Sequence, residues 1–133
     1  MEGANLDAIL CLEQGYPSVE DYIVRDWEDS FASQDANDLL AMAYTWQSAN
    51  VGMTPGCDGN KAKALGRITA KACVIAGQTD MYFPPEDNKL DASHIKDAEF
   101  LVIPSILGHQ AGAGANPADV LVVDRAIANL LSR

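Results

Sequence analysis

The chain has 133 residues, of which 48% are hydrophobic and 21% are charged, and its formal net charge is -10. This length allows one domain with a modest core, and the sequence holds no apolar stretch long enough to cross a bilayer. The acidic residues are concentrated before Asp58, where Arg25 is the only basic residue. Because this charge repels phosphate backbones, nucleic acid is not an expected partner, and a solvated acidic helical face is the simplest interpretation.

The first residues bear on where the protein is located, and the cysteines bear on whether it has disulfides or a metal site. Met1 to Asn5 carry neither the basic leader nor the apolar core of a secretory signal, so we expect a cytoplasmic location and no membrane partner. Cys11, Cys57 and Cys73 are widely spaced and form no Cys-x-x-Cys pair. They predict neither a disulfide framework nor a zinc site, and the sequence implies no metal and no bound cofactor.

The first half of the chain predicts three amphipathic helices. Apolar residues recur at helical spacing over Asn5–Gln14, until a Gly-Tyr-Pro turn ends the pattern. Ser18 then begins a second helix as its cap, and Asp35 is the expected N-cap of a third helix within 33–50. Trp46 lies on the apolar face of this third helix and is a candidate substrate-binding residue, although core or interface packing is the more common role of such an aromatic.

A glycine- and proline-rich loop from Val51 to Asn60 separates the helical, acidic part from a more neutral part. We therefore divide the chain into residues 1–59, which are helical, and residues 60–133, which are of the α/β type. The last helix is expected to begin at Asn116 and Pro117, after a glycine-rich run that directly follows His109.

Two short apolar runs, Lys71–Gly77 and Ala98–Pro104, flank a helix-like segment led by two prolines. This order predicts two buried parallel strands joined by a crossover helix. Asp80 and His109 each follow the carboxyl end of one run, which is where functional groups collect in open α/β sheets. The two side chains can share a hydrogen bond in which the Asp sets the imidazole tautomer and the His acts as a base toward a nucleophile.

Asp80 has a simpler interpretation as a cap or turn residue before Phe83 and the two prolines. The hydrolytic interpretation also lacks its third member. α/β-Hydrolases follow the order Ser, acid, His, with the Ser in a Gly-x-Ser-x-Gly elbow. The serines that precede Asp80 have no flanking glycines and lie in segments that are helical or approach a helix: Ser18, Ser30, Ser33 and Ser48.

Four segments combine into a more specific pattern. They are Asp35–Leu40, Thr45–Gln47, Ala76–Asp80 with Phe83–Glu86, and Gly108–His109. Their order and spacing resemble the C-terminal part of the homoserine O-acetyltransferase-like branch of the α/β-hydrolase superfamily, over most of the chain.

This resemblance implies a partial α/β-hydrolase fold. Residues 1–59 would be a lid-like helical segment, and residues 60–133 would be the C-terminal β-α-β-α part with two parallel strands. Asp80 would be the triad acid and His109 the triad base, whereas the Ser nucleophile and the oxyanion hole would lie in the half that this chain lacks. Lid helices in this family commonly build a dimer interface and cover the acyl site.

The residue after His109 departs from the family pattern. Homoserine acetyltransferases carry an Asp there to receive the substrate amine, whereas this chain has Gln110. A neutral amide loses a charge-assisted hydrogen bond to an ammonium group, which contributes about 1.5 to 3 kcal/mol. We therefore expect Gln110 to contact a substrate other than homoserine, in acyl transfer or ester hydrolysis, with acyl-CoA as a candidate acyl donor.

Two hypotheses remain open at this point. The chain is either the C-terminal portion of an acyltransferase or ester hydrolase, inactive alone because a triad acts as a unit, or a non-catalytic dimerisation or partner-binding module. The edge of the strand over 71–77 is apolar and unprotected by proline, and two strands are fewer than usually stand alone. We expect a homodimer through the lid helices or this edge, or pairing with the missing N-terminal half.

Overall fold

The computed structural model describes residues 15–132, so the helix expected over Asn5–Gln14 lies outside the described residues. The chain folds as two compact units, one ending at Ala49 and the other beginning at Asn50. From the glycine- and proline-rich loop we expected this division after residue 59. The segment between the two positions is part of the second unit because its short helix over Val51–Met53 packs against the helix over Lys61–Leu65.

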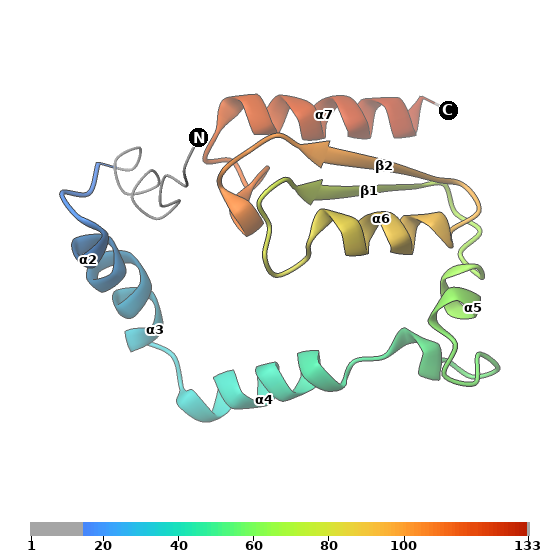
Figure 1. Cartoon of the computed structure of the whole chain (residues 1–133), viewed down its shortest axis with the longest axis horizontal. Coiled ribbons are helices and arrows are strands. Elements are labelled where there is room, and N and C mark those ends of the chain that lie inside the picture. Colours follow the sequence, from blue (N-terminus) through green and yellow to red (C-terminus); the bar gives the residue numbers. More distant parts are fainter. Residues whose placement is uncertain (1–14, 133) are drawn as a thin grey trace. The chain divides into compact units, whose positions relative to one another are not determined.

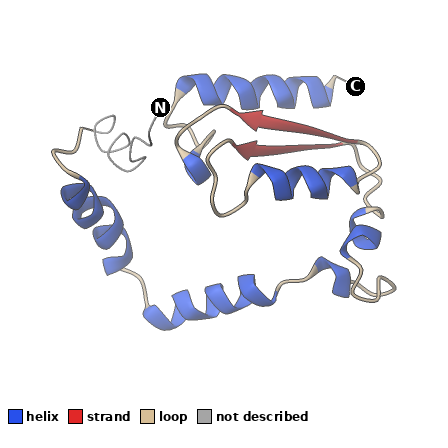
Figure 2. Ribbon diagram, viewed as in Figure 1, coloured by secondary structure: helices blue, strands red, loops and turns tan. Residues whose placement is uncertain are grey.

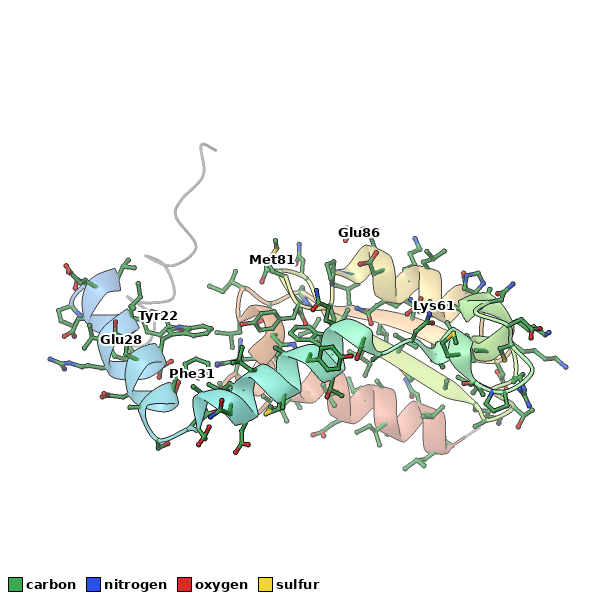
Figure 3. All side chains as sticks on the ribbon, turned by 90° about the horizontal axis from the view of Figure 1, so that it is seen from below. Tyr22, Glu28, Phe31, Lys61, Met81 and Glu86 are labelled. Carbon is green, nitrogen blue, oxygen red and sulfur yellow. The ribbon has the colours of Figure 1, made fainter. Side chains whose placement is uncertain are left out.

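The described part of the first unit begins with a helical stretch over residues 19–32. As expected, Ser18 caps it: the Ser18 Oγ accepts a hydrogen bond from the Asp21 N–H at 3.0 Å. Its middle six residues form a π-helical segment, which the amphipathic pattern did not predict. Figure 3 shows Tyr22, Glu28 and Phe31 along this stretch. Its elements are α2 (Val19–Tyr22), η1 (Ile23–Glu28) and α3 (Asp29–Ala32).

The second helix of the first unit, α4 (Ala36–Ser48), confirms the helix expected within 33–50. Asp35 is its N-cap, and the Asp35 Oδ1 accepts a hydrogen bond from the Asn37 N–H at 2.7 Å. Such a bond satisfies one of the backbone donors that a helix start leaves without an intrahelical partner. None of the residues of α4 is buried.

The second unit contains the sheet. Two parallel strands pair in register from Ala72 opposite Ala98 to Gly77 opposite Ile103, as the two apolar runs predicted. Figure 1 and Figure 2 show the strands side by side with one long helix on each side. The elements are η2 (Val51–Met53), α5 (Lys61–Leu65), β1 (Ala72–Gly77), α6 (Pro85–Ser93), β2 (Ala98–Ile103), η3 (Gly108–Gln110) and α7 (Pro117–Leu131).

The two long helices of this unit begin where their prolines predict. Pro85 and Pro117 lie in the first turns of α6 and α7, where the missing N–H removes no intrahelical bond. Asn116 caps α7, because its Oδ1 accepts a hydrogen bond from the Ala118 N–H at 2.9 Å. α6 packs on both strands and α7 packs on β1, so each helix covers part of the sheet.

The buried core of the second unit is small and consists mainly of small side chains. Ala76 and Ile103 are buried at the carboxyl ends of the strands, Ala92 is buried on α6 and Ala126 on α7. Small residues let the helices approach the strands closely. Because the two strands are parallel and Gly77 lies opposite Ile103, the loops that follow β1 and β2 begin next to each other. None of the helices within residues 15–132 is long and apolar enough to cross a membrane.

Candidate active site

Asp80 is held by the turn that follows β1. Its backbone N–H donates to the carbonyl oxygen of Gly77 at 3.1 Å. Its Oδ1 accepts two hydrogen bonds from the turn that leads into α6, one from the Tyr82 N–H at 2.8 Å and one from the Phe83 N–H at 3.0 Å. The residue is 7% exposed. The backbone therefore fixes one carboxylate oxygen and leaves the other, Oδ2, for a second partner.

That second partner is His109, which lies in η3 beyond the end of β2. The His109 Nδ1 is 3.1 Å from the Asp80 Oδ2, across 29 residues of sequence. The imidazole ring contacts Tyr82 edge-on at a centroid distance of 5.1 Å and lies tilted against Phe83 at 5.4 Å. The His109 side chain is 51% exposed. One face of the site is thus supported by aromatic rings while the imidazole stays accessible.

The surroundings of Asp80 favour its ionised form. Burial alone would raise the pKa of the carboxyl group, but the backbone N–H of Phe83, the His109 ring and the backbone N–H of Tyr82 together lower that pKa below its ordinary value. A carboxylate at neutral pH is an acceptor, so Nδ1 of His109 is the ring nitrogen that carries the proton in the neutral imidazole. The Nε2 lone pair is then available as a base.

A side chain of α6 holds the turn that carries these donors. The Asn88 Nδ2 donates to the carbonyl oxygen of Phe83 at 2.7 Å and to that of Pro84 at 3.0 Å. Met81 lies in this turn and is exposed. Figure 3 shows Met81 on the loop before α6 and Glu86 on α6 itself. Asn88 therefore ties the end of the turn to α6, while Met81 within the turn faces solvent.

A cavity of about 310 Å³ adjoins the pair. Three of its lining residues are consecutive in β1: Ile75, Ala76 and Gly77. The other lining residues are Asp80, Phe83, Asn88, Ile103, Gly108, His109, Ala111, Gly112 and Val123. The cavity thus runs along the end of β1 and reaches β2 and α7, and the candidate pair lines it.

The structure brings together two of the four residues that the sequence singled out. The expected hydrogen bond between Asp80 and His109 is confirmed. Gln110 follows His109 in η3, is exposed, and is not among the residues that line the described cavity. Trp46 is exposed on α4 of the first unit. The substrate contacts of Gln110 and Trp46 stay predictions, as do the catalytic roles of the pair.

Sequence reasoning missed the residues that support the pair. An Asp whose carboxylate accepts from the N–H two residues on is an Asx-turn, so the pattern from Asp80 to Phe83 could have identified the backbone donors. Asn88 bonds to carbonyl oxygens four and five residues before it, a local contact that the sequence analysis did not consider. Thr79 bonds to residues 26 and 29 positions away, which only the folded chain brings close.

Comparisons with known proteins find mainly ester hydrolases. No family model matches the chain. The chain is 35% identical over 118 residues to an ethyl acetate hydrolase of Pseudomonas veronii. The aligned region covers 89% of this chain and 33% of that protein. Among solved structures, the acetyl esterase MekB matches this chain with a TM-score of 0.83 and 33% sequence identity. An acetylester hydrolase from Corynebacterium glutamicum matches it with a TM-score of 0.79 and 30% sequence identity.

Both structural matches cover 92% of this chain and 35% of the other. The chain thus spans about a third of the length of the relatives it matches. At this level of identity and structural agreement, the chain has part of an α/β-hydrolase fold, and the three relatives named above are ester hydrolases by name. A shorter match, 49% identical over 41 residues, is to a proline iminopeptidase of Pestalotiopsis fici.

Proposed function

We propose that this chain is the part of an ester hydrolase that supplies the acid and the base of a Ser-His-Asp triad. Asp80 is the acid and His109 is the base. The observation that carries this proposal is the 3.1 Å hydrogen bond between the Asp80 Oδ2 and the His109 Nδ1, made while two backbone N–H groups hold Oδ1. The names of the relatives, which include ethyl acetate hydrolase and acetyl esterase, support acetyl esters as the substrate class.

The proposed mechanism requires the following proton transfers. Asp80 keeps the proton of neutral His109 on Nδ1, so Nε2 accepts the proton of a serine hydroxyl as the serine oxygen attacks the ester carbonyl. The imidazolium then donates this proton to the leaving alkoxide, and the acyl-serine ester remains. Water attacks the acyl-serine, with Nε2 again taking and returning one proton, which releases the acid. Ionised Asp80 stabilises the imidazolium in both halves of the cycle.

In this proposal the serine comes from outside the described residues. Its support is that within residues 15–132 no serine hydroxyl is hydrogen-bonded to His109, and that Ser105, which follows β2, is buried and accepts from the Leu107 N–H at 3.2 Å. We place the missing part of the fold at the edge of β1, where Ile75, Ala76 and Gly77 line the cavity that also contains the pair. A strand added there would extend the sheet beyond two strands, toward the size at which sheets become independently stable.

Hydrolysis is a better fit than acyl transfer to homoserine. Gln110 directly follows His109 in the sequence. Its side-chain amide is neutral and cannot form an ion pair with the ammonium group of homoserine. The matched relatives are named as hydrolases, whose acyl acceptor is water. A transferase would need an acyl donor such as acyl-CoA, so replacing the ester by acetyl-CoA in the assay separates the two activities.

A chimera tests this function. The present chain would replace the matching part of the acetyl esterase MekB, and hydrolysis of p-nitrophenyl acetate would be measured for the chimera and for its His109→Ala variant. We expect the chimera to hydrolyse the ester and His109→Ala to lower kcat by about 10³-fold or more, because loss of one triad member removes most of the activity. Equal rates for the folded chimera and the folded variant, compared by circular dichroism, would refute the role of His109.

A non-catalytic module is the second candidate, and one observation favours it. α4 carries large apolar side chains that are mostly exposed: Leu40 is 69%, Met42 65% and Tyr44 72% accessible. Contiguous exposed apolar surface marks interaction sites, and Leu40 and Tyr44, which are four residues apart in the helix, lie on one face. A homodimer through these helices would dissociate in Leu40→Ser/Tyr44→Ser, measured by sedimentation equilibrium, whereas the triad role predicts activity in the chimera whatever the oligomeric state.

A further inference from the structure

One hydroxyl group joins the loop that carries Asp80 to the loop that carries His109. The Thr79 Oγ1 donates to the carbonyl oxygen of Ser105 at 3.1 Å and accepts from the Gly108 N–H, also at 3.1 Å. Thr79 immediately precedes Asp80, and Gly108 immediately precedes His109. The hydroxyl therefore uses its proton and a lone pair to connect the direct neighbours of the two triad candidates.

The loop beyond β2 needs such a connection. Residues 104–108 separate the end of β2 from His109, and the imidazole itself is half exposed. Gly108 has a φ of +55°, which a residue with a side chain rarely adopts. A Cβ at Gly108 would lie 3.4 Å from the Thr79 carbonyl oxygen, in ordinary van der Waals contact, so the loop passes within about one side-chain atom of the Thr79 backbone.

The Asp80 side of the site is supported differently. The Tyr82 and Phe83 N–H groups that hold the Asp80 Oδ1 belong to the same turn as Asp80 and need nothing from the loop beyond β2. Loss of the Thr79 hydroxyl would leave those two bonds in place and remove the acceptor of the Gly108 N–H. One substitution at Thr79 can thus remove the support of the loop that carries His109 without removing the backbone hydrogen bonds to Asp80.

We propose that Thr79 is a positioning residue whose hydroxyl holds the Gly108–His109 loop at the distance at which Nδ1 meets the Asp80 carboxylate. Thr79 does not touch substrate or transfer a proton. It acts through the orientation and tautomer of His109, and its importance for catalysis rests on the triad role proposed above.

The test compares Thr79→Val, which keeps the shape and removes the hydroxyl, with Thr79→Ser, which keeps the hydroxyl. In the full chain, amide hydrogen exchange would be followed at Gly108 and Tyr82, and the tautomer of His109 would be read from the ¹⁵N shifts of its ring. We expect Thr79→Val to speed exchange at Gly108 relative to Tyr82 by about 10-fold or more. It should also move the His109 ring signals toward those of Asp80→Asn, whereas Thr79→Ser should retain the wild-type pattern.

The reference at Tyr82 guards against simple destabilisation, because a global loss of stability speeds exchange at both amides together. Wild-type ring signals in Thr79→Val, or exchange at Gly108 that rises only in step with Tyr82, would refute the positioning role. Ring signals of His109 that do not respond to Asp80→Asn would refute the pair itself, and with it the proposed function. A response to Asp80→Asn without a response to Thr79→Val would overturn only the inference about Thr79.

Discussion

The backbone of Gly77 and the carbonyl oxygen of Gly108 approach so closely that no side chain fits between them. A Cβ at position 77 would overlap the Gly108 carbonyl oxygen and lie 3.0 Å from the Cβ of Ala111. Gly77 is the last residue of β1, and Gly108 directly precedes His109. This contact sets how near the loop beyond β2 comes to the turn that contains Asp80.

Substitution of Gly77 by Ala should therefore destabilise the second unit. The new methyl group would push against backbone atoms that cannot rotate away, and overpacking of this kind costs about 1 to 3 kcal/mol. Equilibrium unfolding in urea measures the change. Gln78→Ala is the matched control, because Gln78 is exposed and its backbone N–H bond to the Ile103 carbonyl oxygen does not depend on the side chain. An unchanged midpoint for Gly77→Ala would contradict the close approach.

Asp80 should make the stability of the chain depend on pH. The pKa of its carboxyl group is lower in the folded chain than its ordinary value, so between these two values the unfolded chain binds more protons. The stabilisation is fully present above the ordinary carboxyl pKa of about 3.9 and is lost as the pH falls through the lower folded value. The Asp80→Asn variant has no carboxylate at this position and so lacks this stabilisation at every pH.

The free energies of unfolding of the wild type and Asp80→Asn should consequently converge in acid. Urea unfolding at several pH values between about 7 and about 2 would show this convergence as a shrinking difference between the two proteins. Asp97→Asn, which removes the charge of an exposed residue, controls for the loss of one negative charge. A difference that grows as the pH falls would mean that the folded chain does not favour the carboxylate.

The chain alone should hydrolyse p-nitrophenyl acetate no faster than its His109→Ala variant. An acid and a base without the serine can at best orient a water molecule, and removal of the nucleophile from a triad costs about as much as removal of all three members. Initial rates at equal protein concentration provide the comparison. Wild-type activity that disappears in the variant would show that a nucleophile within this chain completes the site.

The cap of α7 should contribute measurably to stability. Asn116→Ala removes the acceptor of the Ala118 N–H and should cost about 0.5 to 2 kcal/mol. Asn116→Asp keeps a capping oxygen and should lie close to the wild type. Thermal or urea unfolding of the two variants side by side tests this, and equal losses for both would mean that the cap oxygen contributes nothing.

Local patterns were enough to predict most elements of the described fold. The apolar runs over 71–77 and 98–104 correspond to β1 and β2, and the caps Ser18, Asp35 and Asn116 lie where their types predicted. These features depend on neighbouring residues, which is why sequence reveals them. The π-helical segment over Ile23–Glu28 was not predicted, because a wider turn changes hydrogen bonding without changing the amphipathic pattern at that length.

Local patterns along the chain indicate the order strand, acid, helix, strand, histidine, and so the two residues from which a site could be built. That these two side chains meet depends on the folded chain. The distance between Asp80 and His109 depends on the parallel register of β1 and β2, on the close approach of Gly77 to Gly108, and on a Thr79 hydroxyl that bonds across 26 and 29 residues. Such contacts join residues far apart in sequence, so no local preference encodes them.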